Sequence, residues 1–77
     1  MTIKVLYFAS LREEIGRASD LVSTDDSIQI SQLWKQATGR KTMPDELLVA
    51  VNQEYTGTDA HVKSGDEVAF FPPVTGG

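Results

Sequence analysis

One amphipathic helix in the middle of a short chain constrains the fold more than any other feature. Ile30, Leu33, Trp34 and Ala37 follow the i, i+3, i+4, i+7 spacing of a single helix face. Gly39 follows where a glycine commonly ends a helix. Because 77 residues can form one domain with one modest core, this helix must supply much of that core. We expect Trp34 to be a core anchor.

Apolar segments on both sides of this helix predict strands. They cover Ile3–Phe8, Leu21–Thr24, Leu47–Val51 and Val68–Phe71. A short helix over about Leu11–Ile15 is expected between the first two, because Ser10–Glu13 has the S-x-x-E form of a capping box and Gly16 suits a C-cap. Tyr55 is expected in a turn after the third strand. The order strand, strand, helix, strand, strand predicts an α+β fold, a β-grasp (ubiquitin-like) mixed sheet packed on one main helix.

The first predicted strand is apolar on both of its faces. Ile3, Val5 and Tyr7 alternate with Lys4, Leu6 and Phe8. One explanation is a strand at the centre of the sheet, since a β-grasp makes the first and last strands parallel neighbours there. Another is an apolar patch on the solvent side that awaits a partner.

Composition excludes several functional classes. The net charge of −4 argues against nucleic acid and anionic membranes as partners and suits a basic protein. The chain has no cysteine, so it has neither disulfides nor thiolate chemistry. The apolar run near the N-terminus is too short for a signal peptide or a membrane span, so we expect a cytoplasmic protein. His61 has no second ligand beside it, and we expect no metal site and no cofactor bound by this chain.

The last six residues, Pro72–Gly77, predict an extended tail beyond a domain of residues 1–71. The two prolines cannot continue a strand, and six residues can reach about 20 Å. Gly76 and Gly77 have no Cβ, so this end can enter a narrow pocket of another protein. A partner that uses ATP could convert the Gly77 carboxylate to an acyl-adenylate. Sulfide would then give a thiocarboxylate, whereas an amine would give an amide.

Three blocks spanning the chain carry a family resemblance. "IKVLYFASLRE", "LLVAVNQE" and above all "GDEVAFFPPVTGG" resemble the small subunit of molybdopterin synthase, a ubiquitin-like sulfur carrier family. The resemblance implies that an E1-like adenylyltransferase activates Gly77 with ATP and that sulfur arrives there as a thiocarboxylate. The tail, namely Pro72, Pro73, Val74, Thr75, Gly76 and Gly77, would insert into the large synthase subunit.

The same resemblance implies the reaction and the assembly. The tail would donate sulfur to cyclic pyranopterin monophosphate to form the molybdopterin dithiolene, as the small subunit of a sulfurtransferase whose substrate pocket lies on the large subunit. Two small and two large subunits would form a heterotetramer. Two alternatives stay open, a modifier joined to lysines of other proteins and an interaction module whose tail is only a docking peptide.

The resemblance also implies a partner-facing surface formed by Phe8, Arg12, Tyr55 and Phe71. The competing interpretations are core positions for the two phenylalanines, a stray exposed aromatic for Tyr55 and a solvated helix residue for Arg12. Tyr55 departs from the aliphatic residue usual there, and the turn at Pro44 is short. If the first and last strands are parallel neighbours, Phe8 and Phe71 meet where the tail leaves.

Overall fold

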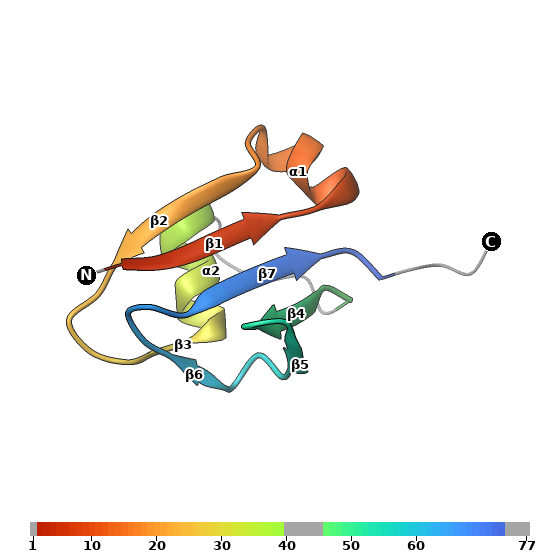
Figure 1. Cartoon of the computed structure of the whole chain (residues 1–77). Helices are drawn as coiled ribbons and strands as arrows, with labels where there is room; N and C mark the ends of the chain where they lie inside the picture. The colour runs from red at the N-terminus through yellow and green to blue at the C-terminus, as the bar shows by residue number, and fades with distance from the viewer. Residues whose placement is uncertain (1, 40–45, 74–77) are drawn as a thin grey trace.

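The computed structural model describes residues 2–39 and 46–73 (Figure 1). Its elements in chain order are β1 (Thr2–Tyr7), α1 (Ala9–Ile15), β2 (Ser19–Ser23), β3 (Ile28–Gln29), α2 (Ile30–Thr38), β4 (Leu48–Val51), β5 (Glu54–Thr56), β6 (His61–Val62) and β7 (Glu67–Phe71). The turn at Pro44 and the tail residues Val74–Gly77 lie outside the described residues.

The main sheet has five strands in the order β2-β1-β7-β4-β5, and β3 pairs with β6 in a separate two-stranded sheet. β1 and β7 are parallel, with Val5 opposite Val68 and Tyr7 opposite Phe70, whereas the other pairs in the main sheet are antiparallel. α2 lies across one face of this sheet (Figure 1). The predicted β-grasp, a mixed sheet on one main helix, is confirmed.

The core forms between α2 and the face of the sheet that it covers. Ile30, Leu33 and Trp34 on α2 are fully buried, which confirms that the apolar spacing marks the buried helix face. The indole of Trp34 meets the ring of Phe70 edge to face at 5.1 Å between centroids. Tyr7 also stacks on Phe70, at 6.4 Å between ring centroids. Phe70 therefore joins the helix to the two central strands.

The predicted capping box at Ser10 is wrong. The N-cap of α1 is Phe8, which makes no side-chain cap hydrogen bond, and Ser10 lies inside the first turn. The backbone N–H of Phe8 still donates to the carbonyl of Phe70 at 3.2 Å, so the chain passes from the β1–β7 ladder into the helix within one residue. Ala9 takes up this change with φ at 54°. Gly16 ends the helix in the left-handed region, as expected.

The position expected for Tyr55 is also wrong. Asn52 and Gln53, both at positive φ, form a tight turn, and Tyr55 lies beyond it in β5. Three short strands, β3, β5 and β6, were not predicted, because two or three residues give too little alternation for a pattern.

A polar network fixes the end of the sheet that carries α1. The Tyr7 hydroxyl donates to Asp20 at 2.9 Å, and Arg17 Nε pairs with the same carboxylate at 2.7 Å. Arg17 Nη2 donates to the Ala37 carbonyl at 2.8 Å, so the network reaches the last turn of α2. Burial, together with the bond to Asp20, raises the pKa of the Tyr7 hydroxyl far above its ordinary value, so it remains a donor.

Asn52, Asp66 and their neighbours form a second network, at the opposite end of the sheet. Asn52 Oδ1 accepts from the backbone N–H of Glu67 at 3.0 Å, and Asn52 Nδ2 donates to Asp66 at 3.0 Å. Asp66 also accepts from the backbone N–H of Lys63 at 2.9 Å. This clasp joins the β4–β5 turn to the turn before β7. The bond from Lys63, followed by that from Asn52, lowers the pKa of Asp66.

The clasp predicts acid-sensitive stability. A lowered folded pKa means that Asp66 stabilises the fold above its unfolded pKa, about 4, and that this contribution is lost as the pH falls below it. Asp66→Asn should therefore lower the Tm at neutral pH, with a loss in the free energy of unfolding of a few tenths to about 1 kcal/mol, because the hydrogen bonds of Asp66 are exposed to water. The difference from the parent protein should shrink at about pH 2. Thermal unfolding followed by circular dichroism measures both.

Asp25→Asn is the matched control, since it makes the same change at an exposed carboxylate in a loop outside the clasp. An Asp66→Asn deficit that stays the same size at low pH would show that the clasp acts by shape and not by charge.

Candidate functional site

The candidate site lies where β7 ends. Because β1 and β7 are parallel, both strands end at the same edge of the sheet, beside α1 (Figure 1). The chain leaves the sheet after Phe71, through Pro72 and Pro73. These prolines offer no N–H for a further strand ladder. The fold therefore places Phe8, which follows β1, next to the first residues of the expected tail.

Three aromatic side chains, Phe8, Tyr55 and Phe71, gather at this edge, and we call them the aromatic patch. The ring of Phe71 contacts Phe8 at 6.5 Å and Tyr55 at 5.7 Å between centroids. Phe8 is 48% exposed and Tyr55 75% exposed, while Phe71 is partly buried between them. The expected proximity of Phe8 and Phe71 is thus present, and β5 brings Tyr55 to the same place.

The patch continues along the face of the sheet that α2 leaves uncovered. Leu6 lies opposite Ala69, Ala69 opposite Ala50, and Ala50 opposite Tyr55, so these four side chains form one row across the strands. The other face of β1 is buried under α2. The expected place of β1 inside the sheet, as the parallel neighbour of β7, is confirmed. One face of β1 is core, and the other is an open face that carries the apolar patch.

Arg12, the fourth residue expected at this surface, lies on α1. Its side chain is exposed, and its backbone N–H donates to the carbonyl of Phe8 at 3.4 Å. Within the described part of the chain, the cation–ring contact is that of Arg17 with the ring of Tyr7, on the covered side of the sheet, and does not involve Arg12. Arg12 thus lies at the same edge, one helical turn after Phe8.

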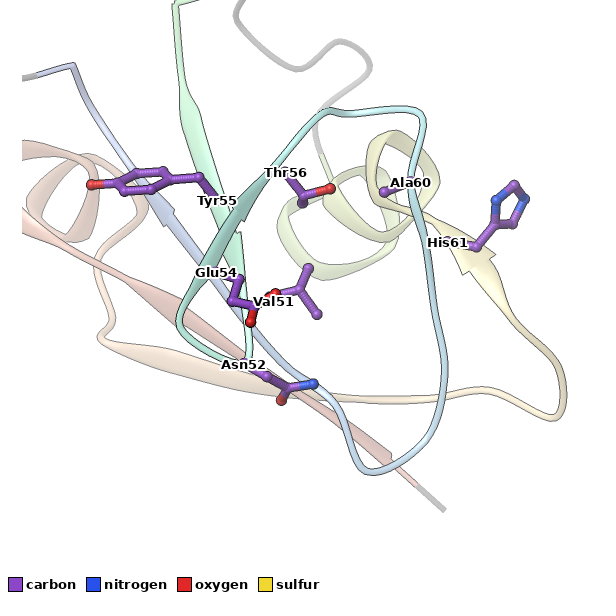
Figure 2. A pocket seen from close by; sticks show the side chains of 7 residues that line it. All are labelled: Val51, Asn52, Glu54, Tyr55, Thr56, Ala60 and His61. Carbon is purple, nitrogen blue, oxygen red and sulfur yellow. The ribbon is translucent and has the colours of Figure 1, made fainter.

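A hollow that Tyr55 also lines has a geometry that does not indicate catalysis. It measures about 440 Å³ and is lined by Val51, Asn52, Glu54, Tyr55, Thr56, Ala60 and His61. Figure 2 shows the side chains of Tyr55 and His61 pointing to opposite sides, away from the space between them. No group of three metal-ligating side chains comes together among residues 2–39 and 46–73. The same residues contain no helix that is long and apolar enough to span a membrane.

Residues 5–77 match the ThiS family. The chain is 40% identical to the molybdopterin synthase sulfur carrier subunit of Escherichia coli over 97% of its length and 99% of the relative's. It is 38% identical to that of Haemophilus influenzae, with the same coverage, and 34% identical to the human one, covering 97% of this chain and 93% of the relative.

Solved structures share the fold. SAMP1 from Haloferax volcanii superposes with a TM-score of 0.80 at 25% identity, over the whole of both chains. A complex of subunits 1 and 2 of the molybdopterin-converting factor from Helicobacter pylori contains a chain that superposes with a TM-score of 0.63 at 21% identity, again over the whole of both chains.

One buried ring and one exposed ring give a direct test of which aromatic side chains stabilise the fold. Phe70 is fully buried, so Phe70→Ala should cost about 3–5 kcal/mol, enough to unfold a domain of this size. Tyr55→Ala removes an exposed ring and should change the free energy of unfolding by about 0.5 kcal/mol or less. Chemical denaturation measures both. A Tyr55→Ala loss as large as that of Phe70→Ala would place Tyr55 in the core.

Proposed function

The chain belongs to the ThiS family and to the molybdopterin synthase sulfur carrier subunits, and from that premise we propose that it carries sulfur as a thiocarboxylate on Gly77. The observation that supports this most directly is the aromatic patch beside the root of the tail. A carrier has to be held by other proteins while its tail reaches into them. An exposed aromatic cluster at the tail's exit is the kind of surface that such docking uses.

The proposed chemistry begins with activation of the Gly77 carboxylate. A carboxylate oxygen attacks the α-phosphorus of ATP bound by an E1-like adenylyltransferase, and pyrophosphate leaves. Sulfur delivered at the sulfide level then attacks the carbonyl carbon, and AMP leaves to give the thiocarboxylate. The chain contributes the acyl group and a slim backbone, while the partner provides the nucleotide site.

The proposed delivery takes place on the large subunit of molybdopterin synthase. The thiocarboxylate sulfur is transferred to cyclic pyranopterin monophosphate, and water restores the Gly77 carboxylate. A dithiolene contains two sulfurs, so each product needs two deliveries, which suits the heterotetramer that we propose. The Helicobacter pylori complex of subunits 1 and 2, which contains a chain of this fold, supports the large subunit as the partner. We place the reaction in the cytoplasm.

A second candidate function is protein modification, with Gly77 joined to lysines of target proteins. The superposition on SAMP1 from Haloferax volcanii favours this function, because that protein is a small archaeal modifier protein. Both functions share the activation step and differ in the nucleophile. Intact-mass analysis of the chain from cells separates them: one oxygen replaced by sulfur supports the carrier, and high-mass conjugates support the modifier. The unchanged mass alone would leave the tail as a docking peptide.

Deletion of Gly77 should abolish sulfur transfer and leave the Tm unchanged, because the tail lies beyond β7 and two prolines.

Gly76→Val should block adenylation more than docking, since a β-branched side chain obstructs a narrow pocket and stiffens the backbone. Pyrophosphate release with the activating enzyme and binding to the large subunit measure the two effects. A large fall in Tm on deletion, or equal losses in adenylation and docking for Gly76→Val, would contradict this assignment.

The aromatic patch should serve both partners in turn, so the two complexes should exclude each other. Burying one such ring contributes on the order of 1.5–3 kcal/mol. Phe71→Ala and Tyr55→Ala should therefore weaken both complexes by about tenfold or more. Arg12→Gln should change mainly the association rate and its salt dependence. Competition binding with the two purified partners is the measurement, and a stable ternary complex would overturn the shared patch.

A further inference from the structure

A second hollow lies at the root of the tail, where Pro72 and Pro73 leave the sheet. The aromatic patch lies on the other side of this exit. The hollow measures about 390 Å³, more than ten times the roughly 30 Å³ that one water molecule occupies in the liquid. We call it the tail-root groove; it is lined by Ser10, Leu11, Glu14, Glu46, Leu47, Pro72 and Pro73. α1, the segment leading into β4 and the first residues after β7 thus enclose one space.

The tail-root groove combines an apolar lining with two carboxylates. Leu11 is only 3% exposed, and Leu47 and Pro72 are half-buried, so these side chains form apolar walls. Glu14 and Glu46 are exposed and bring two negative charges. Among the lining residues that the structure describes, none is a lysine, arginine or histidine. The prolines contribute no N–H, so that wall cannot donate hydrogen bonds to the carboxylates.

This position makes the groove part of any complex that encloses the tail. Pro72 and Pro73 line the groove and also begin the tail, so a pocket that takes in the tail must bring its mouth against the groove. Covering the groove removes water from Glu14 and Glu46. A carboxylate that loses water without gaining a cation or a donor is strongly unfavourable. A cation from the partner, at the mouth of its pocket, would supply the compensating charge.

We propose that the tail-root groove receives a lysine or arginine side chain from the protein that binds the tail. This inference rests on the proposed function, because it needs a partner that encloses the tail. The long aliphatic stem of such a side chain suits the walls of Leu11, Leu47 and Pro72. Its charged head then lies between Glu14 and Glu46. Arginine fits best, because its planar head can donate to two carboxylates at once.

The chain's own cations are the competing occupants. Arg40 and Lys41 precede Glu46 in the sequence and lie outside the described residues. Glu14 already interacts with a neighbour in the free chain. A partner's cation at Glu14 must add to or replace that existing interaction. Glu46 is therefore the carboxylate to test first. An internal occupant would stabilise the free chain, whereas a partner's cation stabilises only the complex.

The test measures binding of the full chain to the purified large subunit by titration calorimetry at several salt concentrations. Glu46→Gln should weaken binding by about fivefold or more, Glu14→Gln/Glu46→Gln by about tenfold or more, and Glu46→Lys more than Glu46→Gln. The double variant should also flatten the dependence of Kd on salt. Glu13→Gln/Asp25→Asn is the matched control, because it removes two exposed carboxylates outside the groove and should leave Kd nearly unchanged.

The outcomes separate this proposal from the proposed function. If Phe71→Ala weakens binding but the groove variants behave like the control, the partner supplies no cation and this proposal alone is wrong. If the groove variants lower the Tm of the free chain and leave Kd unchanged, the occupant is Arg40 or Lys41. If neither Phe71→Ala nor the groove variants affect binding, the proposed docking to the large subunit fails as well.

Discussion

The parallel pairing of β1 with β7 is the contact on which the rest of the structure depends. It joins the two ends of the chain, with Val5 opposite Val68 and Tyr7 opposite Phe70. Parallel strands end at the same edge, so this one pairing brings Phe8, Phe71 and the root of the tail together. An antiparallel pairing would have sent the tail to the other end of the sheet. The core then closes over this pair, because Trp34 and Tyr7 both pack against Phe70.

The two faces of the main sheet have different roles, and adjacent residues of β7 lie on different faces. Phe70 is fully buried under α2, whereas Phe71 faces the open side and contacts two exposed rings. Side chains alternate along a strand, so one residue can stabilise the fold while the next is available to a partner. A domain this small has little interior to spare for a catalytic cavity. Surface recognition beside a tail suits its size better than an enclosed active site does.

Charge and apolar surface are also arranged around the exit of the tail. The aromatic patch lies on the open sheet face, and Glu14 and Glu46 lie in the tail-root groove on the other side of Pro72. Apolar contact and charge complementarity make different demands of a partner, the first for affinity and the second for rate and specificity. A protein that receives the tail meets both demands at once. The negative net charge of the chain also favours a basic partner.

The sequence alone determined the features that depend on neighbours along the chain. The periodicity of Ile30 to Ala37 set the buried face of α2, and the glycines after each helix set where the helices end. The blocks that resemble a sulfur carrier family also pointed to the family that the comparisons show. Tertiary structure decided the rest. The capping box failed because Phe8 keeps its ladder bond to Phe70, 62 residues away, and Tyr55 entered a strand too short to leave a pattern. The aromatic patch, the clasp at Asn52 and the tail-root groove each join segments far apart in the sequence. Such contacts exist only once the chain has folded, since local spacing does not say which distant segment lies alongside.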